Sequence, residues 1–428
     1  MQSTIKKILI PSNIVNILLS ILPISFIAGN LAINLNIVII IIFTISVYRE
    51  NILSINLNLV DKLLIVLFLF SFLTGFINSI TFSENSNFIF NMAILKKSFF
   101  FSRYLLFYFI IRFLIDKGIF NFKYFFVSAS FFSLFVALDL ILQLLAGKDI
   151  FGYLKSPRNL SGPFGDEYIA GSYLQRYSIF IFFLIPFIFK DRNKKYLLLV
   201  LSIFFILVFF SMLVAGNRMP IILFVLMFVF LFLIEKKLRK YSLIFIFFST
   251  ILFIFFFNIS FQVEDYTRHF LDRFYELIYF IFEIIFQRKD PMMTNTYIKE
   301  FYTGYAAWME NPIFGGGINP FYFNCLKNYG ACSTHPHNYY LEILSEIGLV
   351  GFILLMFIFF KILQMCINSK NDFSYDFNKN LMTPFLLIFL VEIFPLKSSG
   401  SFFTTGNASF IFFIIAILVS LSKKSQNN

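Results

Sequence analysis

Long apolar stretches recur along the whole chain. Twelve of them approach the roughly 20 residues that a helix needs to cross a bilayer. Because lipid offers no hydrogen-bonding partner to open backbone, such stretches cross the membrane as helices. The sequence therefore predicts an all-α, polytopic membrane protein with about 12 transmembrane helices, or eleven if Gly29-Asn30 fails to separate the first two. The stretches lie at about 13–29, 31–47, 62–80, 98–115, 124–146, 169–189, 196–214, 219–234, 242–262, 338–362, 382–396 and 406–422.

Composition excludes the soluble alternatives. Hydrophobic residues make up 59% of the 428 residues and charged residues only 14%, whereas an average soluble domain is about 45–50% apolar. So few charges cannot cover the surface of a cytosolic globular enzyme, and a disordered chain would be far more polar. The N-terminal apolar run has no small-residue cleavage site, so we interpret it as a first anchor rather than a signal peptide.

The basic residues set the expected orientation. The formal net charge is +12, and no basic-aromatic pattern indicates nucleic acid. With the N-terminus inside, the inner segments hold 19 basic residues and the outer segments, apart from one long loop, hold seven. This asymmetry predicts that both termini lie in the cytoplasm.

The sequence divides into three expected regions. Residues 1–262 would form spans 1–9, residues 263–337 an outward-facing loop with short helices, and residues 338–428 spans 10–12. The loop contains all three histidines and the only Trp. Asn311-Pro312 ends its second helical stretch, and GGGINP then predicts a flexible turn. We expect chemistry where this loop meets the membrane.

The segment THPHNYYLEILSEIGLVGF (334–352) is the most informative in the chain. His337 stands at the outer membrane boundary, and a neutral imidazole can accept a proton from an alcohol near neutral pH. Asn338, Glu342 and Glu346 follow at steps of four and share one helical face. A carboxylate inside a bilayer faces a cavity or a partner. The alternative is that His337 is a helix-start residue bonded to backbone and that the glutamates pair with buried arginines.

Two further segments carry cations on the outer side. In AGNRMPII (215–222), Arg218 lies on a short turn before a helix that starts near Pro220. Arginine binds phosphate with two parallel hydrogen bonds, and a helix N-terminus favours anions. The alternative is an interfacial arginine that contacts lipid headgroups.

In SPRNLSGPFGDEYIAGSYLQRY (156–177), Arg158 and flexible glycines form a polar lip suited to a glycan. Arg176 follows in the sixth span. The alternative is a re-entrant turn in which Arg176 pairs with Asp139 of the fifth span.

The long loop supplies more cations and two cysteines. Arg273 and Arg288 are candidates for a second contact to a diphosphate. Cys325 and Cys332 are close in sequence and would face an oxidising compartment, so we predict a disulfide, with two free thiols as the alternative. Cys366 should lie inside and stay reduced. No metal-binding or nucleotide-binding fingerprint occurs, which favours catalysis without a metal or a cofactor.

Three segments in order resemble a known family. The stretch NPIFGGGINPFYFNC…CSTHPHNYYLEILSEIGLVGF resembles the signature region of the bacterial O-antigen ligase and O-antigen polymerase superfamily, and RNLSGPFGDEYIAGSYLQR and AGNRMP look like family positions. The resemblance covers roughly residues 156–360. It implies a GT-C-like membrane glycosyltransferase of the bacterial inner membrane, with its active site and helical loop between spans 9 and 10 in the periplasm.

The resemblance also implies substrates and roles. The donor would be an undecaprenyl-diphosphate-linked glycan, and the acceptor lipid A-core for a ligase or another carrier-linked glycan for a polymerase. His337 would activate the acceptor, Arg218 would hold the diphosphate, and Glu346 matches the family glutamate. Many members have an arginine, followed by a tryptophan, at the positions where this chain has Tyr297 and Phe301. Arg288 is therefore the first choice for a second diphosphate ligand and Arg273 the second.

The sequence favours a metal-independent, inverting ligase over a polymerase, because HPHN with paired loop cysteines looks more like ligase members. A transporter or flippase for an anionic solute is the alternative from another class, with Arg103, Arg112, Asp139, Arg176 and Glu392 along a path. Polar residues gather on one side of the membrane and no inverted repeat is visible, which argues against it.

Overall fold

We describe the protein from a computed structural model. The structure describes residues 10–81, 88–156, 159–189, 193–258, 296–318, 321, 335–369, 381–397 and 400–426, and single helical residues between 272 and 286. Within these residues every regular element is a helix, and one isolated bridge pairs Lys148 with Leu154. The all-helical class predicted from the sequence is confirmed for this part of the chain.

The helices follow one another along the chain with short connections. Three of them, η1, η3 and η4, are 3-10 helices. Their bounds are α2 Pro11–Ser20, α3 Leu22–Ala28, α4 Asn30–Tyr48, η1 Arg49–Ser54, α5 Leu59–Thr81, α6 Phe88–Phe101, α7 Arg103–Asp116, α8 Phe122–Ala146, η3 Gly162–Phe164, α9 Ala170–Tyr177, α10 Ile179–Ile188, α11 Lys194–Val214, α12 Arg218–Ile234, η4 Lys236–Leu238, α13 Arg239–Asn258, α15 Thr296–Glu310, α17 Tyr339–Asn368, α18 Met382–Glu392 and α19 Thr405–Gln426.

Each of the twelve predicted stretches contains helix, but not every one is a full span. By length and composition, nine helices of the described residues can cross a membrane. The pair α2 and α3 makes a tenth if its 41° bend lies within one span. The remaining two, α12 and α18, are shorter apolar helices of 17 and 11 residues. Because α18 ends at Glu392 and α12 begins at Arg218, polar residues limit both.

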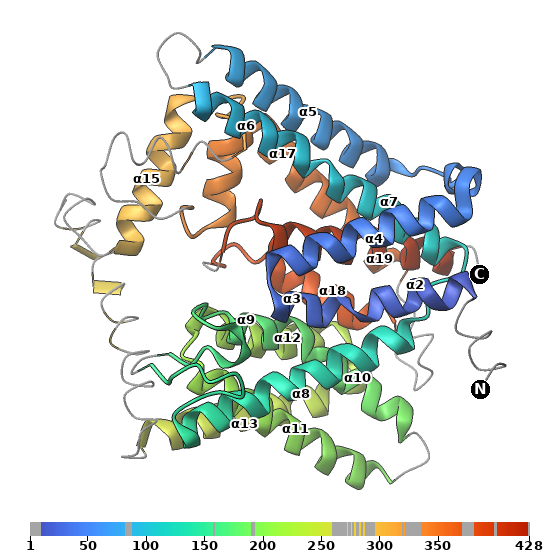
Figure 1. Cartoon of the computed structure of the whole chain (residues 1–428). Helices are drawn as coiled ribbons and strands as arrows, with labels where there is room; N and C mark the ends of the chain where they lie inside the picture. The colour runs from blue at the N-terminus through green and yellow to red at the C-terminus, as the bar shows by residue number, and fades with distance from the viewer. Residues whose placement is uncertain are drawn as a thin grey trace.

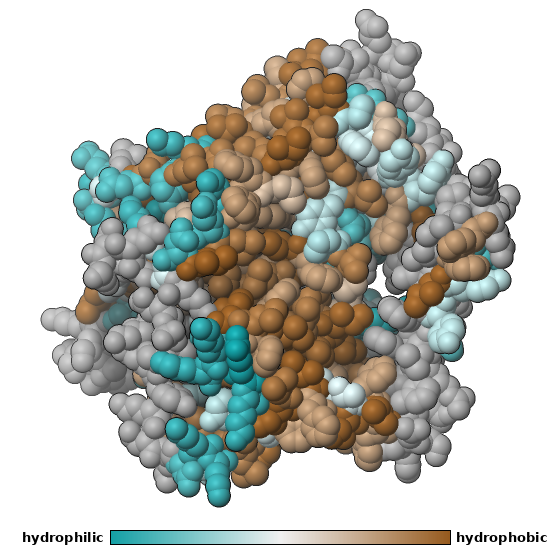
Figure 2. All heavy atoms as spheres, turned by 180° about the vertical axis from the view of Figure 1, so that it is seen from behind, coloured by the Kyte–Doolittle hydropathy of each residue, from teal (hydrophilic) through white to brown (hydrophobic). Residues whose placement is uncertain are grey.

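The helices run side by side in one bundle (Figure 1). Helices α8 to α13 form the lower part of the view, while α4 to α7, α17 and α19 form the upper part. The two chain ends lie at the same edge, on the right, and α15 lies at the opposite edge. Brown apolar atoms cover much of the middle of the face in Figure 2, with teal hydrophilic groups along its left edge. This surface is the one expected of a multi-pass membrane protein.

Aromatic side chains fill the core. Phe101 of α6 and Tyr104 of α7 both contact Phe412 of α19, with ring centroids 5.9 and 6.4 Å apart. The upper half also contains a buried ion pair: the Arg112 guanidinium contacts the Asp61 carboxylate, and both side chains are fully buried. Arg112 therefore has a structural partner and need not line a solute path.

Candidate functional site

His337 is held at the start of α17 in a strained backbone conformation. Its φ is 49°, in the left-handed region that only glycine adopts readily. Its Nε2 atom lies 3.4 Å from Oε2 of Glu300 on α15, and the His337 side chain is 28% exposed. The imidazole is therefore both accessible and oriented by a carboxylate from another helix.

A second imidazole stands beside it. The ring centroids of His335 and His337 are 4.3 Å apart. Burial, and then the nearby His337 ring, lower the pKa of His335 to about 4. At neutral pH His335 is therefore an uncharged neighbour of His337.

Asn338 caps α17. Its Oδ1 accepts hydrogen bonds from the backbone N–H groups of Tyr340 (2.9 Å) and Leu341 (3.1 Å). Its Nδ2 donates to the carbonyl oxygen of Pro395, 3.0 Å away. This cap fixes the point where α17 begins and thus the place of His337.

The two glutamates of α17 are buried, with exposures of 2% for Glu342 and 3% for Glu346. The Glu342 carboxylate accepts hydrogen bonds from the Ser401 hydroxyl and from the backbone N–H of Phe402. Both carboxylates interact electrostatically with the ammonium group of Lys97 on α6. Among the described residues, the cation beside both carboxylates is thus a lysine, and the alternative that the glutamates pair with buried arginines stays open.

The helix α17 is broken at Gly348, whose φ is 64° and ψ −173°. The break frees two carbonyl groups of the preceding turn. The Ser345 carbonyl accepts from the N–H of Gly316, 3.0 Å away. The Glu346 carbonyl accepts from the N–H of Gly317, 2.8 Å away. The glycine turn before α17 thus completes the backbone hydrogen bonding of the helix.

The same turn satisfies the donors on the other side of the break. The N–H of Leu349 donates to the carbonyl of Pro312 (2.9 Å), and the N–H of Val350 to that of Ile313 (3.1 Å). A Cβ atom on Gly315 would lie only 2.4 Å from the Glu346 carbonyl oxygen. The sequence predicted a flexible turn here; the structure instead holds it by four backbone hydrogen bonds inside α17.

Arg176 reaches α18 rather than the fifth span. Its Nε and Nη2 atoms donate to Oε1 and Oε2 of Glu392 over 2.9 and 3.0 Å, and Nη2 also donates to Oδ1 of Asn407 (2.6 Å). The alternative pairing of Arg176 with Asp139 is therefore wrong. Asp139 instead accepts a hydrogen bond from the backbone N–H of Ile150.

The Glu392 carboxylate also binds a lysine. The ammonium of Lys397 contacts Oε2 of Glu392 and donates to the hydroxyl of Tyr339, 3.0 Å away. Tyr339 is the first residue of α17. One buried polar network therefore joins α9 and α18 to the helix that follows His337.

The turn before α12 is bound to the segment before α9. Asn217 accepts a hydrogen bond from the N–H of Gly171 (3.1 Å) and donates one to the carbonyl of Tyr168 (2.9 Å). Arg218 is the first residue of α12 and is half-buried. Because Gly171 and Arg176 both lie on α9, the three polar segments singled out in the sequence are linked to one another.

Five predicted residues fall outside the described part of the chain. The predictions for them stay open. They are Arg158, Arg273, Arg288, Cys325 and Cys332. Cys366 is a buried free cysteine. The described residues contain no group of three or more His, Cys, Asp or Glu side chains arranged to hold a metal ion.

Sequence reasoning missed four of the charged residues. Lys97 and Lys397 looked like ordinary outer-loop cations, Glu300 lay in no motif, and Glu392 was noted only as a residue of a transport path. Lys397 and Glu392 are nonetheless 2% and 1% exposed. A charged residue beside an apolar run was the available signal that such a residue could be buried. The sequence could not identify the partners of these residues, because the partners are far away along the chain.

Together these features describe a polytopic helical membrane protein whose site combines a surface imidazole, a bound glycine turn and buried ion pairs. Residues 177–356 match the family model described as O-antigen ligase, and over these residues the resemblance seen in the sequence is confirmed. His337, Glu300, Glu346 and Arg218 lie within the match. No curated protein matches the chain significantly. The match implies a membrane glycosyltransferase-type enzyme acting on lipid-linked glycans.

Proposed function

We propose that the protein is an O-antigen ligase that transfers a glycan from undecaprenyl diphosphate to lipid A-core. The observation that carries the proposal is the His337–Glu300 pair at the entrance of α17, within the region that matches the family. Helix α15, which carries Glu300, lies at the edge opposite the chain ends in Figure 1. With both termini in the cytoplasm, as the basic residues predict, this edge faces the periplasm and the protein sits in the inner membrane.

His337 would act as the general base. The acceptor hydroxyl oxygen attacks the anomeric carbon of the donor, and its proton passes to the imidazole. The bond between the anomeric carbon and the phosphate oxygen breaks, and the electron pair leaves with the diphosphate carrier. In-line attack inverts the anomeric centre. Glu300 would stabilise the imidazolium that forms and hold the ring in one orientation.

Arg218 would bind the departing diphosphate. It stands at the N-terminus of α12, where unpaired backbone N–H groups and the helix dipole add to its charge. A second cation would come from the long loop, with Arg288 the first choice and Arg273 the second, and Arg158 would contact the glycan. With arginines neutralising the developing charge, the scheme requires no metal ion or cofactor.

The polar residues of α17 would position these groups. Asn338 fixes the start of the helix, and Glu346 anchors the glycine turn through its carbonyl oxygen. Contact of either side chain with substrate remains part of the proposal. The polymerase alternative uses the same donor and the same base and differs only in its acceptor.

Transfer by the purified full-length protein tests the proposal. The reaction contains undecaprenyl-diphosphate glycan, lipid A-core and a chelator. We expect glycan on the core with the wild-type protein, and none with His337→Ala or Arg218→Ala. Lys361→Ala is the matched control, since this side chain lies far along α17, where it contacts Gln364, Phe357 and Phe360. Longer carrier-linked glycan with untouched core would assign a polymerase. No transfer to either acceptor would contradict the enzyme proposal.

A further inference from the structure

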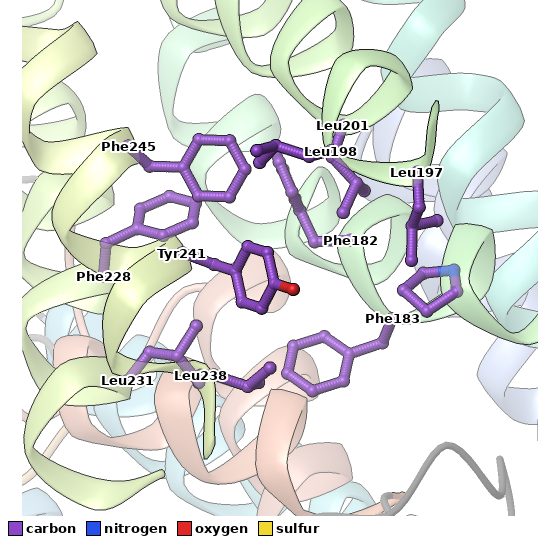
Figure 3. A pocket seen from close by; sticks show the side chains of 11 residues that line it. Phe182, Phe183, Leu197, Leu198, Leu201, Phe228, Leu231, Leu238, Tyr241 and Phe245 are labelled. Carbon is purple, nitrogen blue, oxygen red and sulfur yellow. The ribbon is translucent and has the colours of Figure 1, made fainter. Parts of the chain in front are cut away.

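An apolar pocket lies away from the candidate site, between α10, α11, α12 and α13 (Figure 3). Its cavity volume is about 60 Å³, a narrow space between the four helices. Buried rings of Phe182, Phe228 and Phe245 line its inner part. The catalytic proposal makes no use of it.

The pocket opens toward the end of the bundle that carries the chain termini. The lining residues nearest the starts of α11 and α13, Leu197 and Tyr241, are half-buried, whereas Leu201 and Phe245, one turn deeper, are buried. Exposure therefore falls with depth along both helices, as in a pocket entered from one end.

Basic residues lie at the entrance of the pocket, at the starts of α11 and α13. Lys194 and Lys195 begin α11 just before Leu197, and Lys237, Arg239 and Lys240 surround the lining residue Leu238; all five cations are exposed. Glu235, the acidic residue between α12 and η4, is buried and accepts a hydrogen bond from Thr383. Teal groups along the left edge of Figure 2 mark the same end of the molecule. The entrance is therefore strongly positive.

One polar group lies inside the entrance. The Tyr241 side chain projects among the apolar side chains of the pocket (Figure 3). Within the described residues, its hydroxyl has no hydrogen-bonding partner. Tyr241 lies about one helical turn deeper than Lys237. If Lys237 binds the phosphate of a lipid, the ester groups of that lipid would lie at the depth of Tyr241.

We propose that this pocket is a binding site for one anionic phospholipid of the leaflet on the side of the chain termini. An acyl chain enters between the phenylalanines, the ester region meets the Tyr241 hydroxyl, and the phosphate binds the lysines of α11, η4 and α13. Charge selects the lipid: a zwitterionic headgroup gains less from a cationic entrance, and basic segments beside a membrane attract anionic lipids. Burial of the acyl chain between four helices distinguishes the site from ordinary lipid contact at the surface.

Native mass spectrometry of the delipidated full-length protein tests the proposal. Phosphatidylglycerol or phosphatidylcholine with the same acyl chains is added, and bound lipid is counted. We expect one phosphatidylglycerol to bind about tenfold more tightly than phosphatidylcholine. Replacing Lys194, Lys237 and Lys240 by Gln should abolish that preference. The matched control replaces Lys62, Lys117 and Lys361 by Gln. If both triple variants keep the preference, or both lose it equally, the headgroup site is overturned.

A second variant tests the pocket itself. Leu198→Trp should fill it and remove the bound lipid, while Leu233→Trp, at an exposed position on α12, should leave binding intact. Equal binding in both variants would overturn the proposal. If Leu198→Trp fails to fold, crosslinking of the wild type with a diazirine-tailed phosphatidylglycerol decides. Label on Phe182, Phe228 and Phe245 supports the site; label spread evenly over exposed apolar residues contradicts it. A polyprenyl lipid retained there through purification would also overturn the choice of occupant.

Discussion

Arg176 on α9 and Glu392 on α18, 216 residues apart, form a two-pronged ion pair in the interior of the bundle. Lys397 contacts the same carboxylate and reaches the first residue of α17. The pair thus joins α9 of the lower helices in Figure 1 to α18, and through Lys397 to α17 of the upper helices.

Loss of the shared Glu392 carboxylate should lower thermal stability more than loss of one of its two cations. Glu392→Ala leaves both Arg176 and Lys397 without their buried counter-charge, and removing one partner of a buried pair costs about 3–5 kcal/mol. Arg176→Ala leaves Glu392 with Lys397. We therefore expect both variants to lower the midpoint of thermal unfolding in detergent, with Glu392→Ala the lower. The opposite order would contradict this account.

Gly348→Ala should disrupt the break in α17. The new Cβ would lie 2.3 Å from the Ile313 carbonyl oxygen, so the glycine turn must move. Gly118→Ala is a matched control: its φ of 72° is similarly left-handed, but nothing lies within 4 Å of the added atom. The control should show only the backbone cost of about 1–2 kcal/mol, and Gly348→Ala a larger loss measured by unfolding in denaturant. Equal losses would show that the turn adapts freely.

Asn217 variants should separate the two hydrogen bonds of its side chain. Asn217→Ala loses both bonds between the α12 turn and the segment before α9, at about 1 kcal/mol each. Asn217→Asp keeps the acceptor for Gly171 but cannot donate to Tyr168. We expect the Asp variant to fall between the wild type and Ala in thermal stability. An Asp variant no better than Ala would argue against the Gly171 bond.

His335 should make the fold sensitive to acid. Burial lowers its pKa to about 4, whereas the imidazole of an unfolded chain titrates near ~6.5. Between these values the unfolded state binds more protons, so the His335 contribution is complete above pH ~6.5 and is lost as the pH falls toward 4. Melting temperatures at pH 7.5 and 5 should differ more for the wild type than for His335→Gln. Parallel pH profiles would contradict the assignment.

Glu300→Gln should weaken catalysis without abolishing it. The amide keeps the shape of the side chain but no longer stabilises the imidazolium, so the transfer rate should fall about tenfold, against ~10²–10⁴-fold for His337→Ala. Initial rates at saturating donor and acceptor measure both. Glu310→Gln, at the far end of α15, is the matched control. A Glu300→Gln enzyme with full activity would remove Glu300 from the mechanism.

The sequence predicted the helices that a membrane requires, but it did not predict the side-chain partners that depend on tertiary packing. Apolar length located the helices, and polar residues at the ends of apolar runs correctly indicated that His337 and Arg218 stand at helix starts. The partner of Arg176 was misassigned because several buried carboxylates satisfy the same charge, and only packing chooses Glu392 over Asp139. The break at Gly348 escaped notice because a glycine in an apolar run is also common in continuous helices. Glu300 carried no signal at all, since its importance comes from the position of α15.

The break in α17 at Gly348 also affects where the sequence can accept insertions. Residues 312–317 are fixed to the middle of α17, and Asn338 is fixed at its start. The segment between them is therefore attached at both ends to the same half of α17. Closing a longer loop between fixed ends costs little, because the entropy grows only with the logarithm of length. Insertions or replacements between residues 322 and 334 should therefore leave the two attachment points on α17 in place and His337 in register.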